Sequence, residues 1–335
     1  MKIIKNLVTL TFLLLSLGFA RMKAQSYNVS SLGIGEGLSC NYVVSMAQDK
    51  HGFLWFATEE GLNRFDGEQF FKYYKSRKTA NSISSSELNC LLDDPKNPWL
   101  WIGTKTDGLN LFDYENDTFK TFKHEDGNPH SLATNDITYL SAAADGNIWI
   151  TTYWKGVEYL NTETQTFTHY NKRTVKGMPD DQLWCVNDLG NGMIIAGHVH
   201  AGLTIIDTHN RTAHNYRHSP TNPNSIASDE VNSIFKDRNG TIWVGTSNGI
   251  DIFDHVNLRF IHIAPKELQG HRIHDIKQLS DGKIWAATEM NGIIIIDINK
   301  KLYGGGKRRL SLHNHQGRFC QKLSHRKQRK MYLGR

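Results

Sequence analysis

The sequence lacks the residue patterns that most enzymes and membrane proteins need. In 335 residues it has four cysteines, and beyond residues 1–20 it contains no apolar run long enough to cross a bilayer. Its repeat region has no sustained 3.6-residue apolar stripe, which argues against a helical fold. It also lacks a Ser-His-Asp order, a paired-carboxylate spacing and a phosphate-binding glycine loop, so no enzyme chemistry stands out.

What the sequence has instead is one unit repeated six times. The unit is clearest in DRNGTIWVGTSNGIDIFD, residues 237–254, and it recurs around an anchor residue. The anchors are Trp55, Trp101, Trp149, Ile195, Trp243 and Trp285, separated by 46, 48, 46, 48 and 42 residues. A period of this length suits a four-stranded propeller blade and is too long for most helical repeats.

Each unit has the composition of consecutive strands and turns. In the fifth unit, VNSIFKD and TIWVGT are short segments rich in apolar and β-branched residues, and the D-x-x-G between them is a turn. SNG forms the next turn, IDIFD alternates apolar and polar residues, and LRFIHI is a weaker outer strand. The sequence thus predicts an all-β propeller of four-stranded blades, with six recognisable blades of an incomplete seven-bladed ring.

The anchor tryptophans are expected to pack between blades. A blade is a small sheet with two apolar faces, and it buries both only against neighbouring blades. A buried Trp removes about 150–250 Å² from water, worth roughly 4–6 kcal/mol at about 25 cal/mol per Å². The glycine that follows it, as in WIG and WVG, leaves room for the next sheet. We therefore interpret the five anchor tryptophans as structural residues without a ligand role.

The cysteines do not predict a cross-link. Cys90 and Cys185 occupy the same place in the repeat, which Ser45 and Ser233 hold elsewhere, and they lie two blades apart. A disulfide needs Cα atoms within about 7 Å, so a bridge between them would have to cross the ring. We expect both to be small buried residues, not a disulfide or a metal site.

The N-terminal segment has the features of a secretory signal peptide. Lys2 and Lys5 precede an apolar run, and small residues follow it, with cleavage expected after Ala20 or Ala24. An uncleaved N-terminal anchor is the alternative. Residues 1–24 therefore predict export, and residues 25–299 form the propeller repeats of a periplasmic protein.

Residues 300–335 differ from everything before them. From Lys301 onward the chain carries eleven Lys and Arg and no Asp or Glu, while the whole sequence has 39 basic and 33 acidic residues. The basic character is thus a property of this tail, which has no Asp-Gly turn and no Trp-Ile-Gly strand where a blade should continue. We expect either a disordered tail or a reading frame lost near Lys301.

The pattern D-x-x-G-x-I/L-W-I/V/F-G/A-T-x-x-G-L/I-x-x-F-D resembles the two-component regulator propeller repeat. Residues 35–67, GEGLSCNYVVSMAQDKHGFLWFATEEGLNRFDG, are similar to the first repeat of the periplasmic sensor of Bacteroides-type hybrid two-component systems. The resemblance covers about residues 26–299. It implies a sensor for oligosaccharides, with two propellers of about seven blades, followed by a histidine kinase and a DNA-binding domain.

The sequence departs from that family inside what should be the first propeller. It contains no second propeller, kinase histidine motif or ATP-binding glycine boxes, so only a sensory role carries over and no cofactor is expected. The expected partners are an oligosaccharide and the remainder of a sensor kinase. Nucleic acid is not expected, whereas self-association through open strand edges is. The alternatives are an exported propeller enzyme acting on glycans and a non-functional fragment of a frameshifted gene.

Propellers usually bind ligands on the face made by the loops between strands two and three and between strands four and one. In the first set of loops the sequence places two aromatics, two histidines and several charged residues: Tyr153, Trp154, His198, His200, Glu59, Glu60, Lys105 and Glu289. An aromatic ring stacks on a sugar face, and carboxylates accept hydrogen bonds from its hydroxyls. These residues are the candidate ligand contacts, and ordinary solvated loops are the alternative interpretation.

The His-x-His pair at His198 and His200 does not suffice for a metal site. Side chains two residues apart on a strand share a face, so both could meet one ion. Zinc needs at least a third protein ligand, and none is identifiable in the sequence. We therefore predict no metal centre.

Overall fold

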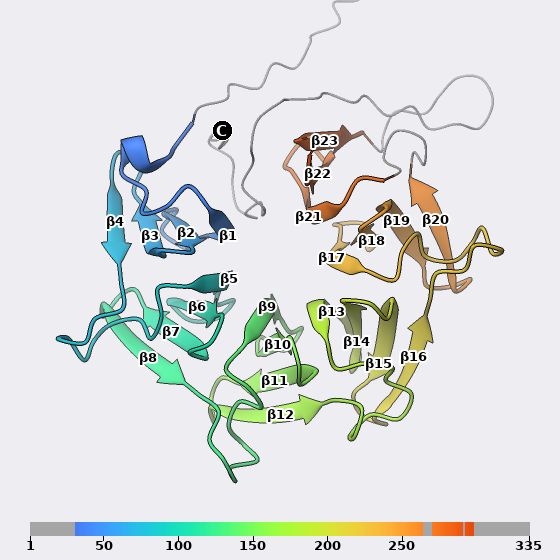
Figure 1. Cartoon of the computed structure of the whole chain (residues 1–335), viewed down its shortest axis with the longest axis horizontal. Coiled ribbons are helices and arrows are strands. Elements are labelled where there is room, and N and C mark those ends of the chain that lie inside the picture. Colours follow the sequence, from blue (N-terminus) through green and yellow to red (C-terminus); the bar gives the residue numbers. More distant parts are fainter. Residues whose placement is uncertain (1–30, 264–269, 291, 298–335) are drawn as a thin grey trace, which may run out of the picture.

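The computed structural model describes residues 31–263, 270–290 and 292–297. Within these ranges six antiparallel sheets stand around a central axis as blades, numbered 1 to 6 in chain order (Figure 1). Five sheets have four strands and the sixth has three, all paired in chain order from the axis outward. The prediction of an all-β propeller with six recognisable blades is confirmed.

The strands follow one pattern in every blade. The innermost strands are β1 (Val43–Gln48), β5 (Leu88–Asp93), β9 (Ile137–Ala142), β13 (Leu183–Gly190), β17 (Val231–Lys236) and β21 (Ile273–Gln278). The second strands are β2 (Leu54–Thr58), β6 (Trp99–Thr104), β10 (Ile148–Thr152), β14 (Met193–His198), β18 (Ile242–Thr246) and β22 (Ile284–Thr288). The third strands are β3 (Gly61–Phe65), β7 (Leu109–Asp113), β11 (Val157–Asn161), β15 (Leu203–Asp207), β19 (Gly249–Asp254) and β23 (Ile293–Ile296). The outer strands are β4 (Phe70–Tyr73), β8 (Thr118–Phe122), β12 (Thr166–Tyr170), β16 (Thr212–Tyr216) and β20 (Arg259–Ile263), and a 3₁₀ turn, η1 (Ile34–Glu36), precedes blade 1.

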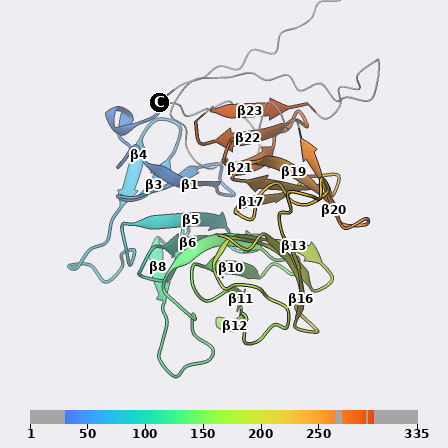
Figure 2. The same cartoon turned by 45° about the vertical axis from the view of Figure 1, so that its right-hand side comes forward.

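Consecutive blades pack through their inner strands. Each inner strand contacts the next one, from β1 against β5 to β17 against β21, so the blades follow one another around the axis (Figure 2). In the described part of the chain no comparable contact joins β21 to β1. The predicted signal peptide (1–24) and the basic tail (300–335) lie outside the described residues.

The tryptophan anchors lie between blades, as predicted. Trp55 and Trp101 are 0% exposed and Trp243 is 1% exposed. In three blades the indole N–H also donates to the aspartate of the preceding turn: Trp55 to Asp49 (2.8 Å), Trp101 to Asp94 (2.7 Å) and Trp243 to Asp237 (3.0 Å). The buried indole therefore keeps a hydrogen-bond partner, which the sequence pattern alone did not indicate.

Blades 3 and 4 share this bond between them. The position of the turn aspartate is held in blade 3 by Ala143, so Trp149 has no aspartate of its own. Its indole N–H instead donates to Asp188 of blade 4 at 2.8 Å. Blade 4 has Ile195 at its own anchor, so Asp188 is available to its neighbour. This single hydrogen bond connects blade 3 to blade 4.

The glycine after the anchor is required by the next blade, as predicted. A Cβ added at Gly103 would lie 2.6 Å from the Ile137 side chain, and one at Gly245 would lie 2.8 Å from Ile273. Cys90 and Cys185 are buried thiols beside this seam, and neither takes part in a disulfide. The interpretation of both as small buried residues is confirmed.

The loops that join one blade to the next are fastened beneath the outer strands. A buried polar residue of the third strand accepts a backbone N–H from the incoming loop in four blades: Asn63 from Ser39 (2.9 Å), Asn110 from Ser84 (3.0 Å), Glu158 from Ala133 (3.0 Å) and Asp251 from Ala227 (2.8 Å). In blade 2 the cross-strand neighbour that supports Asn110 is Thr121, through its hydroxyl (3.1 Å). In blades 3 and 5 the corresponding residue of the outer strand is a histidine, His169 and His262 respectively.

Each of these histidines lies between two acceptors. His262 Nδ1 is 2.6 Å from Asp251, and the Pro223 carbonyl faces its other side. His169 has Glu158 at 3.5 Å on one side and the Pro129 carbonyl at 2.9 Å on the other. A neutral imidazole donates from one nitrogen only, whereas the imidazolium satisfies both acceptors. The Asp251 carboxylate accordingly raises the pKa of His262, and Glu158 raises that of His169.

Replacing Trp243 with alanine should lower the free energy of unfolding by about 3–5 kcal/mol, because a large cavity opens between blades 5 and 6. Urea unfolding monitored by circular dichroism measures the change. Trp154→Ala, which removes a tryptophan that is 57% exposed, is the matched control and should cost little. An unchanged midpoint for Trp243→Ala would show that this residue is not part of the core.

The histidine pairs predict a pH dependence. Because the folded pKa of His262 is raised, its stabilising contribution is complete below the unfolded pKa of about 6.5 and is lost as the pH rises through the folded pKa. The double variant Asp251→Asn, His262→Thr copies the Asn110–Thr121 pair of blade 2. It should lose this part of the dependence in unfolding measured between about pH 5.5 and about pH 8. The same dependence in variant and parent would contradict the role of the pair.

Candidate functional site

One face of the propeller is formed by the loops that follow the second strands and by the starts of the inner strands. At the end of five second strands a threonine hydroxyl donates to the carbonyl of the turn glycine: Thr58, Thr104, Thr152, Thr246 and Thr288. This bond gives the loops a common base. What varies around the ring is the side chains that the loops carry.

Three aromatic side chains gather where blades 3 and 4 meet on this face. Tyr153 and Trp154 follow β10, and their rings lie 4.7 Å apart in an edge-to-face arrangement. Tyr153 also contacts Trp184 of β13, with ring centroids 5.4 Å apart. Trp154 is 57% exposed, so the cluster presents an aromatic ring to solvent. The predicted pair Tyr153 and Trp154 is thus brought together, with Trp184 as a third member.

Trp184 was not among the predicted contacts, and it occupies a special position. The pairing of each inner strand with its neighbour shifts by one residue at the same point in all six blades, where the bulged residues are Val44, Asn89, Thr138, Trp184, Asn232 and His274. Such bulges redirect side chains and are common beside functional sites. Aligning the repeats would have shown Trp184 as the one tryptophan at a position that Val44, Asn89, Thr138, Asn232 and His274 hold in the other blades.

The bulged residues of blades 2 and 3 bond to the next inner strand. The Asn89 amide donates to the Ile137 carbonyl at 2.9 Å, and the Thr138 hydroxyl donates to the Leu183 carbonyl at 2.8 Å. The indole nitrogen of Trp184 is buried and has no hydrogen-bond partner among the described residues. A buried donor without a partner costs about 1–3 kcal/mol, so this tryptophan is poorly explained by stability.

The predicted charged residues lie elsewhere on the face, and three of them form ion pairs. Glu59 of blade 1 pairs with Lys105 of blade 2 at 2.9 Å, and Glu289 of blade 6 lies 3.4 Å from Arg272. Glu60 is exposed beside Glu59. These ion pairs connect neighbouring loops, and they do not join the aromatic cluster of blades 3 and 4.

The two histidines occupy different environments. His198 takes the place of the turn threonine in blade 4, is fully buried, and has Nε2 2.8 Å from the Thr204 hydroxyl. Burial lowers its pKa to about 4, so the imidazole is neutral near pH 7. His200 is exposed. Over the described ranges no group of three His, Cys, Asp or Glu side chains is placed to hold a metal ion.

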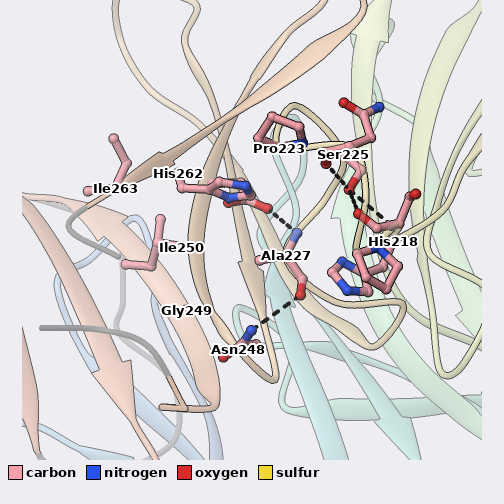
Figure 3. Close-up of a pocket in the computed structure, with 13 residues that line it drawn as sticks. His218, Pro223, Ser225, Ala227, Asn248, Gly249, Ile250, His262 and Ile263 are labelled. Atoms are coloured by element: carbon pink, nitrogen blue, oxygen red, sulfur yellow. Dashed lines mark hydrogen bonds and ion pairs between the residues drawn. The ribbon is translucent and has the colours of Figure 1, made fainter. Parts of the chain in front are cut away.

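A pocket of about 200 Å³ lies between the loop at 218–227 and the outer strands of blade 5 (Figure 3). Its polar groups serve the loop attachment: Asp251 binds Ala227 and His262, Asn248 reaches the Ala227 carbonyl, and His218 Nδ1 lies 2.8 Å from the Ile226 carbonyl. Because these groups already have partners, we interpret the pocket as the seam under the loop rather than as a ligand site.

Comparison with known proteins agrees with the repeat pattern and the fold. A model of the two component regulator propeller family matches residues 37–60 and 225–248. The chain is 40% identical, with a TM-score of 0.76, to the extracellular domain of the putative hybrid two component system BT3049 from B. thetaiotaomicron, over 88% of this chain and 39% of that one. It is also 37% identical over 82 residues to Histidine kinase P4 of Formosa agariphila, covering 24% of this chain and 6% of the kinase.

The chain therefore spans 39% of the length of that extracellular domain. Virginiamycin B lyase from Staphylococcus aureus has a TM-score of 0.58 but 11% identity over 82% of this chain and 85% of the lyase, so the two share the fold alone. Among the residues described, no helix has the length and apolar character that crossing a membrane requires. The chain thus carries the two-component regulator propeller repeat in two stretches, and the matches at 40% and 37% identity are an extracellular domain of a putative hybrid two component system and a histidine kinase.

Proposed function

We propose that this propeller recognises an oligosaccharide in the periplasm as the sensory part of a two-component system. The observation that carries the proposal is the cluster of Tyr153, Trp154 and Trp184 on the loop face, where one ring is exposed and the others support it. Exposed aromatic rings supported by other rings are rigid contact surfaces for the apolar faces of sugars. In blades 1, 2 and 6 the corresponding loops carry charged residues that form ion pairs: Glu59 with Lys105, and Glu289 with Arg272.

The similarity to an extracellular domain of a putative hybrid two component system supports the location outside the cytoplasm and the sensory role. An extracytoplasmic propeller reaches the kinase only through further protein, so the expected partner is the remainder of such a sensor. Export fits the signal-peptide pattern of residues 1–24. Among the residues that the structure describes, no acid and base pair lies beside the aromatic cluster, so recognition explains this part of the face better than catalysis does.

The double variant Tyr153→Ala, Trp154→Ala should lose at least tenfold in oligosaccharide affinity, equivalent to about 1.4 kcal/mol, because the stacking surface is removed. Calorimetric titration with host and plant oligosaccharides measures the change, and a thermal melt checks folding. Tyr74→Ala is the control, since Tyr74 is 47% exposed on blade 1, away from the cluster. Equal affinity in the double variant and the parent would remove these residues from the site.

A further inference from the structure

Each blade places one side chain beside its second-strand loop, at the residue that precedes the inner strand. In five blades a backbone hydrogen bond fixes this neighbourhood, with a loop N–H donating to the carbonyl of that residue. The pairs are Glu59 to Tyr42, Lys105 to Glu87, Val199 to Gln182, Ser247 to Glu230 and Glu289 to Arg272. In blade 3 the antiparallel pairing of Ile137 with Thr152 puts Asp136 next to Tyr153, one residue further along each strand. Asp136 is therefore a direct neighbour of the aromatic cluster.

The other acidic residues at this position have cationic neighbours. Glu230 binds the Arg272 guanidinium through both carboxylate oxygens. In blade 2, Glu59 and more weakly Glu87 raise the pKa of Lys105, which shows that the cation is shared between them. In both places the negative charge is compensated within the protein.

Asp136 has no such compensation. Within the described ranges its carboxylate has no ion pair and no hydrogen bond, although the side chain is partly buried. Burial alone raises its pKa, with no contribution from a charged neighbour. A carboxylate that loses part of its hydration without gaining a partner destabilises the protein. Unfavourable groups of this kind, placed in a cleft or beside a binding surface, are candidates for contact with a ligand.

We propose that Asp136 is the polar half of the aromatic site, and that it selects ligands that bring hydrogen-bond donors and no negative charge. The inference rests on the proposed function and specifies its ligand: a neutral sugar whose hydroxyls donate to Asp136, or an amino sugar whose ammonium group does. The rings of Tyr153 and Trp154 cover the apolar face of the sugar. A uronic acid or a sulfated sugar would bring a second anion beside a carboxylate that has no counter-ion, which is disfavoured.

Three defined tetramers test the proposal in calorimetric titrations: one of neutral glucose units, one of glucosamine and one of galacturonate. The parent protein should bind the neutral or the cationic tetramer at least tenfold more tightly than the galacturonate. Asp136→Asn should reduce this ratio at least tenfold, because the charge is removed and the shape is kept. Glu87→Gln, at the equivalent position of blade 2, is the matched control and should leave the ratio unchanged.

A second measurement does not depend on any ligand. Asp136→Asn should leave the melting temperature of the ligand-free protein unchanged or raise it, because an uncompensated carboxylate is removed. A clear fall would show that Asp136 supports the fold and would overturn the inference, as would a ratio that Asp136→Asn leaves unchanged. If the parent binds none of the tetramers, the proposed function fails together with the inference. If binding is lost in the double variant Tyr153→Ala, Trp154→Ala but Asp136→Asn leaves the affinity ratio unchanged, the inference is overturned and the proposed function stands.

Discussion

The ring depends on a tryptophan that fills the seam between two blades while its N–H reaches a turn aspartate. Burying the indole gains hydrophobic free energy, but its N–H would lose a hydrogen bond with water unless the protein replaced it. Asp49 replaces it with one carboxylate oxygen, while its other oxygen accepts the Phe53 N–H at 3.0 Å and closes the turn. One aspartate thus fixes the turn within a blade and the contact between blades, which explains why the two residues recur together.

This arrangement commits most of the chain to structure. Three seams require a glycine two residues after the anchor, five second strands end in a bonded threonine, and the loops between blades are fastened by buried polar groups such as Asn110 and Asp251. Even exposed charges on the loop face connect neighbouring blades, as Glu59 and Lys105 do.

The repeat made the fold predictable, because strands, turns and anchors follow from short-range patterns that occur six times. It also singled out Tyr153 and Trp154 as candidate contacts, since both are unusual at their place in the loop. It could not show that Asp188 would serve Trp149 of another blade, or that His198 would be buried against Thr204. These outcomes depend on neighbours distant in sequence. The loop pattern does not include Trp184, because this residue lies on the inner strand β13.

Blades 3 and 4, which meet beside the aromatic cluster, each depart from the repeat. Blade 3 lacks the turn aspartate, while blade 4 lacks the anchor tryptophan, replaces the turn threonine with His198 and has Trp184 at its bulge. Asp136, at the edge of the same corner, has no counter-ion among the described residues. Local rules that a fold obeys elsewhere are usually broken where function requires it, and the cost is met by other contacts. Here the hydrogen bond from Trp149 to Asp188 joins blades 3 and 4 and thereby supports the exposed aromatic cluster where they meet.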